Sequence, residues 1–479
     1  LNRHEQACVI AAEGYARSTG KTGVAIVTSG PGFTNAITGI ADAYMDSIPI
    51  VIISGQVPTT IIGTDGFQEI DAVGISRPCT KHNYLVNKIE DLPRIIKEAF
   101  HLASTGRPGP VHVDIPKDIT AQLGEFIYPS EVSMPTYKPT LNYNKKQLKR
   151  AMEAISNAKK PLLYIGGGAI LSNCGYEIRD LAKKLNIPAV ETLMARGVMG
   201  DENPLFFGML GMHGEYAANM AAHETDLLIS LGARFDDRVT GRLDEFASKA
   251  KVIHIDIDPT SIAKLVVADY PIVGDLKLTV EAMIEDSENY EINDFSNWVE
   301  LLKDYREKEP LRYIDTDDLI KPQWPIQRVG KILGDNAIIS TDVGQHQMWT
   351  AQFFPFSHPR QWITSGGLGT MGFGLPAALG AARAFKGTNR VVVNFTGDGS
   401  ILMNIQELMT CSEHELPVIN IVVNNNYLGM VRQWQTMFYE NRLAETDLTA
   451  QLKFKMLAEA FNCLGYTVST KAEFDEAFK

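Results

Sequence analysis

The stretches "NFTGDGS" at residues 394–400 and "VVNNNYLGM" at residues 422–430 indicate the fold of the C-terminal third of the chain. Each places polar turn residues directly after a run rich in β-branched residues. Asp398 and Asn425 lie 27 residues apart. The apolar residues between them recur at helical spacing, at Ile401, Leu402, Ile405, Leu408 and Met409. A strand–helix–strand unit of this length is a parallel crossover. We therefore expect Asp398 and Asn425 at the carboxyl ends of two strands of one sheet, where open α/β sheets bind ligands.

The residue types at these two turns suit a metal ion and a diphosphate. Asp398 offers a carboxylate, Asn425 an amide oxygen and Tyr427 a main-chain carbonyl, and diphosphate oxygens with water would complete the octahedron of Mg²⁺. Two glycines would let the backbone approach a phosphate, and a serine is expected to open a helix whose N–H groups favour an anion: Gly397, Gly399 and Ser400. Each turn alone would be ordinary, because these residue types dominate turns. The two turns together favour a metal–diphosphate site.

Further out, short β-branched runs alternate with helical patterns along the whole chain, which predicts parallel α/β sheets. We expect three doubly wound domains, at residues 1–128, 145–283 and 322–479. Their strands include "GVAIVT", "PVHVDI", "PLLYIGGGA", "KVIHIDIDP" and "AIISTDVG". The proline-bearing connector "YPSEVSMPTYKPTLNYNKKQ" separates the first two domains, because its prolines break both helix and ladder.

Composition excludes several classes of protein. A net charge of −12 argues against a nucleic-acid partner, which usually meets a basic surface. The five cysteines are scattered without a C-x-x-C pair, which fits buried thiols in a reducing compartment. No apolar stretch approaches the roughly 18 residues of a membrane span, and we expect no membrane association.

The Gly-Asp-Gly and Asn-Asn pair resembles the motif of thiamine-diphosphate-dependent enzymes. Motifs along essentially the whole chain resemble the catalytic large subunit of acetolactate synthases, also called acetohydroxyacid synthases. They are "RHEQ", "TSGPG", "GTDGFQE", "TKHNYLV", "GRPGPVHVDIPKD", "MLGMHG", "GARFDDRVTGR", "VGQHQMW", "SGGLGTMGFGLPAALGA" and "NNYLGMVRQWQ". The resemblance implies a thiamine-diphosphate-binding fold, with pyrimidine and diphosphate domains flanking a Rossmann-like FAD-binding domain. It also implies further family segments at both ends, and we expect this piece alone to have weak or no activity.

The implied reaction is the first common step of valine, leucine and isoleucine biosynthesis. Pyruvate would be decarboxylated on thiamine diphosphate, and the hydroxyethyl carbanion would condense with a second pyruvate or with 2-oxobutanoate. By resemblance, Glu5 is the carboxylate that hydrogen-bonds the cofactor's pyrimidine ring. Without that resemblance, Glu5 reads as an ordinary acid in a first helical turn. Met371, in "GTMGFG" with Gly369, matches the residue that holds the cofactor bent, and Gln345 and His346 match its diphosphate end.

The resemblance also assigns the substrate pocket. Arg238 matches the residue that binds the acceptor carboxylate, for which a planar guanidinium is suited, although a salt bridge with a neighbouring aspartate is an equal alternative. Trp434 and Met430 match residues that shape the pocket toward 2-oxobutanoate. Three more positions match residues near the reacting centre or its access channel: Phe67, Gln68 and Lys81.

The central domain would bind FAD in a structural role. Its "GGG" turn after a strand is not G-x-G-x-x-G and is weak evidence alone. The matching positions are Gly167, Gly168, Met212, His213, Gly214, Arg234, Asp236, Asp256, Asp258, Gly274 and Asp275. The acids among them suit hydrogen bonds to ribose or adenine.

We expect a homodimer or homotetramer, because in this family Glu5 of one subunit meets the Asp398 domain of another. A small regulatory subunit is a further expected partner, and the bacterial cytoplasm the expected location, with a plastid as the alternative. Two rival interpretations stay open: a pyruvate oxidase-like enzyme whose FAD accepts electrons, and a non-catalytic paralogue serving assembly.

Overall fold

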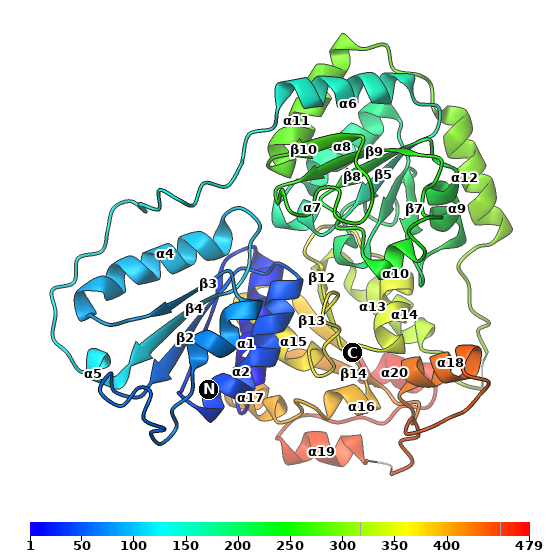
Figure 1. Cartoon of the computed structure of the whole chain (residues 1–479). Helices are drawn as coiled ribbons and strands as arrows, with labels where there is room; N and C mark the ends of the chain where they lie inside the picture. The colour runs from blue at the N-terminus through cyan, green and yellow to red at the C-terminus, as the bar shows by residue number, and fades with distance from the viewer. Residues whose placement is uncertain (317, 451) are drawn as a thin grey trace.

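Three separate parallel sheets make up the computed structural model, which describes residues 1–316, 318–450 and 452–479. Figure 1 shows each sheet with its helices as a distinct body, in the order of the chain. Neighbouring strands within all three sheets run parallel. The fold class predicted from the sequence, three parallel α/β domains, is confirmed.

The N-terminal sheet has the strand order β1-β2-β4-β3 and is covered on both faces. Ile50 and Ile52 of β2 pack with α1 and α2, whereas Val51 packs on the opposite face with α4. This alternation follows from the two-residue period of a strand. The strands are β1 (Gly23–Val27), β2 (Ile50–Gln56), β3 (His82–Leu85) and β4 (Val111–Pro116). The helices are α1 (Glu5–Thr19), α2 (Pro31–Met45), α3 (Ala72–Ser76), η1 (Arg77–Cys79), η2 (Ile89–Asp91), α4 (Leu92–Ser104) and α5 (Lys117–Thr120).

The central sheet has the order β10-β9-β8-β5-β6-β7. The chain therefore leaves β5 in one direction through β6 and β7, and returns beside β5 with β8. This is the strand order of a dinucleotide-binding sheet, and its crevice lies where the order reverses, between β5 and β8. The strands are β5 (Pro161–Ile165), β6 (Ala189–Glu191), β7 (Phe206–Met209), β8 (Leu227–Leu231), β9 (Lys251–Asp256) and β10 (Tyr270–Val273). The helices are α6 (Lys145–Asn157), α7 (Gly168–Leu171), α8 (Gly175–Leu185), η3 (Leu193–Ala195), α9 (Tyr216–Glu224), α10 (Asp237–Thr240), α11 (Leu276–Asp286), η4 (Ser287–Asn289) and α12 (Ser296–Lys308).

The C-terminal sheet has the order β12-β11-β13-β14, so its own reversal point lies between β11 and β13. The strands are β11 (Ala337–Thr341), β12 (Trp362–Ile363), β13 (Val391–Gly397) and β14 (Val418–Val423). The helices are α13 (Gln323–Leu333), η5 (Gly334–Asn336), α14 (Gln345–Phe353), α15 (Gly374–Ala384), α16 (Asp398–Ile401), α17 (Glu407–Glu413), α18 (Gly429–Phe438), α19 (Phe454–Ala460) and α20 (Lys471–Ala477).

The crossover between β13 and β14 differs from the expectation of one continuous helix. It is divided into α16, a single turn, and α17. The break coincides with Asn404, whose side-chain amide donates to the Gly372 carbonyl at 2.7 Å, while its own carbonyl accepts from Glu407 N at 3.1 Å. Asn404 thus ties the crossover to the loop that precedes α15. Ser400 lies inside the short α16 and donates to the Val343 carbonyl at 3.1 Å, so it does not open a long helix as expected.

Helices α1 and α15 join the N-terminal and C-terminal domains by backbone contact. A Cβ added at Gly14 would lie 2.0 Å from the Ala377 carbonyl oxygen, and one added at Gly380 would lie 1.9 Å from that of Ala11. Only glycine fits at such separations. The two helices lie side by side in Figure 1, and their packing fixes the position of the first helical turn, which carries Glu5.

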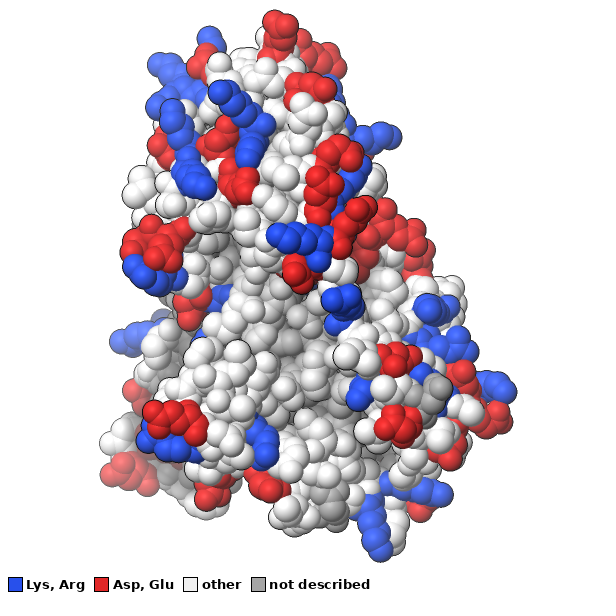
Figure 2. All heavy atoms as spheres, turned by 90° about the vertical axis from the view of Figure 1, so that its right-hand side faces the viewer, with Lys and Arg blue, Asp and Glu red and all other residues white. Residues whose placement is uncertain are grey.

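Among the described residues, no helix is long and apolar enough to cross a membrane. Figure 2 shows acidic and basic side chains interspersed over one face of the molecule, with a largely uncharged, hollowed area between its upper and lower parts.

Candidate active site

A cavity of about 1500 Å³ lies between the three domains. Its walls come from the end of α2, from the segments after β5, β8, β11 and β13, and from α18. Pockets for one small molecule usually measure roughly 300–1,000 Å³. The cavity therefore has room for more than one bound group, and it spans the reversal points of both the central and the C-terminal sheets.

Asp398 and Asn425 lie on this cavity at the ends of adjacent parallel strands, β13 and β14. Asn426 N donates to Asp398 Oδ2 at 3.0 Å, and Tyr427 N donates to Asn425 Oδ1 at 3.1 Å. Burial raises the pKa of Asp398 above its ordinary value. A carboxylate and an amide oxygen each have further lone pairs, so both side chains can still accept from or coordinate a ligand.

A metal ion at the ends of β13 and β14 would be coordinated by different kinds of oxygen atom rather than by a cluster of acidic side chains. Within the described part of the chain, no three His, Cys, Asp or Glu side chains are grouped closely enough to hold a metal ion. One carboxylate, one amide oxygen and the Tyr427 carbonyl form a sparse set, which suits an ion such as Mg²⁺ that keeps water and phosphate oxygens in its shell. The residues present therefore fit a metal that arrives with a diphosphate.

His346 and Gln345 lie beside this pair, at the start of α14. Burial lowers the pKa of His346 to about 3, so its imidazole is neutral, and its Nε2 atom is buried without a hydrogen-bond partner among the described residues. A buried polar atom of this kind normally has a partner. Gln345 Oε1 lies 3.5 Å from Asn425 Nδ2. The two side chains add polar groups next to the proposed metal site.

Met371 faces the cavity from the loop between β12 and α15, together with Gly369. Asp342, which follows β11, accepts a hydrogen bond from Gly372 N at 2.6 Å and another from Thr396 Oγ1 at 3.0 Å. Burial raises the pKa of Asp342 to about 6. Asp342 was not among the predicted site residues, although an acid directly after a buried strand was a signal for it.

Arg238 and Trp434 meet across the cavity from the central and C-terminal domains. The Arg238 guanidinium carbon lies 5.5 Å from the Trp434 ring centroid, a cation–π contact. The alternative of an internal salt bridge is weak here, since Arg238 Nε is 3.8 Å from Asp237 and both side chains are mostly exposed. The contact to Asp236 is made by Arg238 N, not by the guanidinium. The guanidinium is thus available to an anion in the cavity, which Met430 also lines.

The turn after β5 forms the bottom of the crevice in the central domain. A Cβ added at Gly166 would lie 2.3 Å from the Gly232 carbonyl oxygen, and one added at Gly168 would lie 2.8 Å from Gly232 Cα. The ends of β5 and β8 therefore touch, and the predicted positions Gly167 and Gly168 line the cavity at that point. A ligand placed there lies at the carboxyl edge of the sheet.

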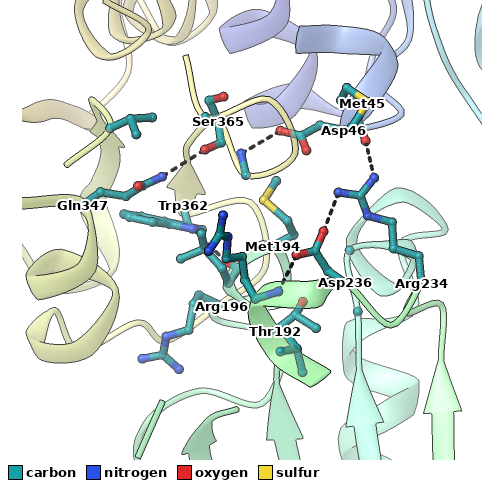
Figure 3. A pocket seen from close by; sticks show the side chains of 18 of the residues that line it. Met45, Asp46, Thr192, Met194, Arg196, Arg234, Asp236, Gln347, Trp362 and Ser365 are labelled. Atoms are coloured by element: carbon teal, nitrogen blue, oxygen red, sulfur yellow. Dashed lines mark hydrogen bonds and ion pairs between the residues drawn. The ribbon is translucent and has the colours of Figure 1, made fainter. Parts of the chain in front are cut away.

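Most other predicted dinucleotide positions also line the cavity, namely Met212, His213, Arg234, Asp236, Asp256 and Asp275. Figure 3 shows Arg234 between the N-terminal and central domains: it donates to the Met45 carbonyl at 3.1 Å and to Asp236 at 3.0 Å. Burial raises the pKa of Asp256 to about 6. Three predicted positions lie outside the cavity lining: Gly214, Asp258 and Gly274. Asp258 instead pairs with Arg107 at 3.2 Å.

Glu5, Phe67 and Gln68 form a second group, away from this cavity, which we call the Glu5 cluster. Glu5 Oε2 accepts from Asn35 Nδ2 at 3.1 Å, and a Cβ added at Gly30 would lie 2.8 Å from the Gln68 carbonyl oxygen. A Cβ added at Gly32 would lie 3.5 Å from Glu5 Oε1, so both Glu5 and Gln68 lie against the "TSGPG" turn. The Phe67 side chain is 89% exposed beside them. None of the three lines the cavity that contains Asp398.

Comparison with known families accounts for all three sheets. Residues 1–75 match the model described as thiamine pyrophosphate enzyme, N-terminal TPP binding domain. Residues 148–283 match the central domain, and residues 342–479 the C-terminal TPP binding domain, of the same enzymes. The acetolactate synthase isozyme 3 large subunit of Escherichia coli is 49% identical over 99% of this chain and 83% of its own length. The acetolactate synthase large subunit of Haemophilus influenzae is 48% identical over 99% of this chain and 83% of its own length, and the acetolactate synthase of Mycobacterium leprae is 48% identical over 97% and 75%.

The chain belongs to the acetolactate synthase large-subunit family. It is thus a thiamine-diphosphate-dependent enzyme, as the resemblance predicted.

One predicted pocket residue of this acetolactate synthase family member has a different environment from the one expected. The Lys81 ammonium donates to the Thr105 carbonyl at 2.8 Å and to Tyr137 Oη at 3.2 Å, at the end of α4. Burial lowers the pKa of Lys81 to about 8. The ammonium therefore caps a helix, where cations are favoured, and does not line the cavity.

An acid that was not among the predicted site residues of this acetolactate synthase family member holds the start of the chain in place. Glu407, fully buried at the start of α17, accepts from Arg3 N at 2.8 Å, from His4 N at 3.1 Å and from Asn2 Nδ2 at 2.9 Å. It thereby fixes the residues that precede Glu5. No spacing rule relates positions some four hundred residues apart, so only the fold could reveal this contact.

Proposed function

We propose that this chain decarboxylates pyruvate and joins the remaining two-carbon unit to a second pyruvate or to 2-oxobutanoate. Membership of the acetolactate synthase large-subunit family supports this reaction. The observation that carries the assignment to particular residues is the position of Asp398 and Asn425 on the same cavity as Arg238 and Trp434. The residues proposed to hold the cofactor's metal and the guanidinium proposed to bind the substrate thus line the same cavity.

Thiamine diphosphate, when bound, supplies the carbon nucleophile to which a 2-oxo acid adds before it loses CO₂. The residues that would hold the cofactor's metal, Mg²⁺, are Asp398, Asn425 and the Tyr427 carbonyl. The neutral His346 and Gln345 would lie at the diphosphate end of the cofactor, and Met371 would press against the cofactor and limit its conformations. The residues of the chain thus bind and orient, and the chemistry is that of the cofactor.

Arg238 would bind the carboxylate of the acceptor 2-oxo acid. Its guanidinium is fixed on one side by the Trp434 ring, and the nearest carboxylate leaves it unneutralised. Trp434 and Met430 would also form the apolar wall that contacts the acceptor's alkyl group. An extra methylene in such a pocket is worth only about 1–3 kcal/mol, so these residues would tune acceptor choice without excluding either acceptor.

FAD is the proposed occupant of the central part of the cavity. The strand order of the central sheet, the close contact of Gly168 with Gly232 and the acids Asp236, Asp256 and Asp275 support this. The cavity volume of about 1500 Å³ supports two adjacent groups rather than one. The role of FAD would be structural, as in the family resemblance.

The complete active site would need two copies of the chain. The Glu5 cluster lies outside the cavity that contains Asp398, yet Glu5 is the proposed partner of the cofactor's pyrimidine ring. A homodimer or homotetramer in which the Glu5 cluster of one subunit meets the Asp398 edge of another would bring the two halves together. Because the relatives are named large subunits, we also propose a small regulatory subunit as partner. Those relatives include bacterial proteins, and the proposed location is the bacterial cytoplasm.

The test is an acetolactate assay on the natural polypeptide that carries this sequence, with thiamine diphosphate, Mg²⁺ and FAD omitted one at a time. Product should require the first two, and flavin absorbance should stay oxidised during turnover. If pyruvate bleaches the flavin at the turnover rate and no acetolactate forms, the protein is a pyruvate oxidase-like enzyme and the proposal is wrong. If no product forms under any condition while all three groups bind, the proposal also fails.

A further inference from the structure

Four charged side chains of α1 and α2 form a buried group at the junction of the domains, which we call the α1–α2 charge cluster. Arg17 Nη2 lies 3.1 Å from Glu13 Oε2, 3.3 Å from Asp42 Oδ1 and 2.8 Å from Asp46 Oδ2. None of the four side chains is more than 4% exposed. Three carboxylates therefore share one guanidinium, and the cluster has more acid than it can neutralise.

Two of these carboxylates reach across to the C-terminal domain. Asp42 Oδ2 accepts from Ser365 Oγ and from Thr370 Oγ1, both at 2.5 Å. Asp46 accepts from the main-chain N–H groups of Gly366 at 3.0 Å and Gly367 at 2.7 Å. Figure 3 shows Asp46 pointing into this loop beside Ser365. The N-terminal domain thus holds the loop of residues 365–370 by four hydrogen bonds to charged acceptors.

The same loop is closed on itself and leads directly to Met371. Thr370 N donates to Ser365 Oγ at 2.9 Å, so the hydroxyl that Asp42 binds also joins the two ends of the loop. Gly366, Gly369 and Met371 line the cavity. Asp42 does not line it, so its effect on the cavity must pass through the loop.

A purely stabilising role accounts poorly for this cluster. Burial, together with the neighbouring carboxylate Asp42, raises the pKa of Glu13 well above its ordinary value, and burial also raises the pKa of Asp42. Excess buried charge of this kind opposes folding, and well-packed apolar residues often stabilise a junction better. Charged acceptors do, however, make shorter and more directional hydrogen bonds than neutral ones. The cluster is therefore better suited to fixing a loop than to adding stability.

We propose that Asp42 and Asp46 are positioning residues for the reaction, which hold the loop of residues 365–370 so that Met371 keeps its place against the bound cofactor. The inference rests on the proposed function, because Met371 matters only if thiamine diphosphate occupies the cavity. It assigns a role to a domain junction outside the Glu5 cluster and outside the cofactor edge.

The first test follows hydrogen exchange of the peptide covering residues 365–371 in the cofactor-free protein. Asp46→Asn should speed exchange of the Gly366 and Gly367 amides about tenfold, since a neutral acceptor binds more weakly than a charged one. Asp42→Asn should speed exchange of the Thr370 amide, because Asp42 holds the Ser365 hydroxyl that accepts from Thr370 N. The matched control is Asp475→Asn, which removes an ion pair with Arg328 between α13 and α20, away from the cavity. It should leave exchange of this peptide unchanged. Unchanged exchange in both cluster variants overturns the proposal.

The second test is kinetic and separates positioning from general loss of stability. Asp42→Asn should lower kcat for acetolactate formation about tenfold or more while the KM for pyruvate stays within twofold, because a small displacement of an orienting group affects the bound reactants. Thr370→Val combined with Ser365→Ala removes the two hydroxyls that donate to Asp42 and leaves the acids in place. It should reproduce this loss, and adding Asp42→Asn to it should lower kcat no further. Additive losses, or a kcat equal to that of Asp475→Asn, overturn the proposal.

The hydrogen-exchange and kinetic tests also distinguish failure of this inference from failure of the proposed function. If the natural protein makes no acetolactate, the function falls, and so does the link from the loop to catalysis. If it is active while the Asp42 and Asp46 variants keep both normal exchange and normal kcat, only the positioning role is wrong. If the Asp42 variants fail to fold, the Ser365 and Thr370 variants alone decide the outcome.

Discussion

Replacing Arg238 with Gln tests the proposed acceptor site most directly. In the structure its guanidinium meets Trp434 across the cavity, with the closest carboxylate 3.8 Å away and both members of that pair mostly exposed. The substitution removes the cation and keeps a polar side chain of intermediate length. We expect the loss to appear in kcat/KM for the acceptor.

The magnitude follows from the contact to the acceptor carboxylate that would be lost, because the contact with Trp434 is already made in the ligand-free chain. A hydrogen bond to a charged group contributes about 1.5–3 kcal/mol, and the exposure of Arg238 places it in the lower half of that range. About 1.5–2.2 kcal/mol corresponds to a roughly 10- to 40-fold loss, since 1.4 kcal/mol is tenfold. Arg238→Lys should recover part of this, because an ammonium keeps the charge but not the two-pronged geometry.

The assay measures acetolactate formation against pyruvate concentration for both variants. Arg242→Gln is the matched control, because Arg242 follows α10 by two residues, is paired with Asp244 and Glu245, and does not line the cavity. It changes the net charge by the same amount in the same segment and should leave kcat/KM within twofold. A normal kcat/KM in Arg238→Gln, or an equal loss in Arg242→Gln, would refute the reasoning.

Three further outcomes are expected. Glu5→Gln should lower acetolactate formation by orders of magnitude while thiamine diphosphate still binds, because the lost bond serves the cofactor's tautomer; an unchanged rate removes Glu5 from the mechanism. Gly380→Ala should lower the unfolding free energy by about 1–3 kcal/mol in urea titrations, because its Cβ would lie 1.9 Å from a backbone oxygen of α1, whereas Gly55→Ala, with its nearest atom at 3.6 Å, should not. Burial raises the pKa of Asp342 to about 6, above the value of about 3.9 in the unfolded chain. Between these two values the folded chain keeps a proton on Asp342 that the unfolded chain has lost. The contribution of Asp342 to the free energy of unfolding therefore falls as pH rises from about 4 to 6. Asp342→Asn should remove that part of the pH dependence of the urea midpoint, and an identical profile in both proteins contradicts it.

The adjacency of Asp398 and Asn425 was predictable from the sequence because it depends on local rules. A strand, a helical run and a second strand of this length leave few topologies other than a parallel crossover. The division of that crossover into α16 and α17 was not predictable, because Asn404 bonds to Gly372, a residue of another loop. Periodicity describes which face of a helix is apolar, but not where a tertiary hydrogen bond interrupts it.

Lys81 and Glu5 show a second limit. The place of Lys81 near the access channel stays a prediction; in the structure its ammonium caps α4 through the Thr105 carbonyl. A motif gives the residue type, and the fold decides which of several carbonyls or ligands lies within reach. Glu5 carries the expected carboxylate, yet it faces the "TSGPG" turn rather than the cavity of its own chain.

By itself, then, the sequence determined the number and class of the domains, the family, and the position of Asp398 and Asn425 at the ends of two parallel strands. These depend on patterns within a few tens of residues, which local propensity and strand order control. Only the tertiary structure decided which distant groups share a space: Arg238 with Trp434, Asp46 with the loop at Gly366, and Glu407 with the residues before Glu5. Such contacts arise from packing between domains, where small differences in helix position, as at Gly14 and Gly380, set which side chains meet.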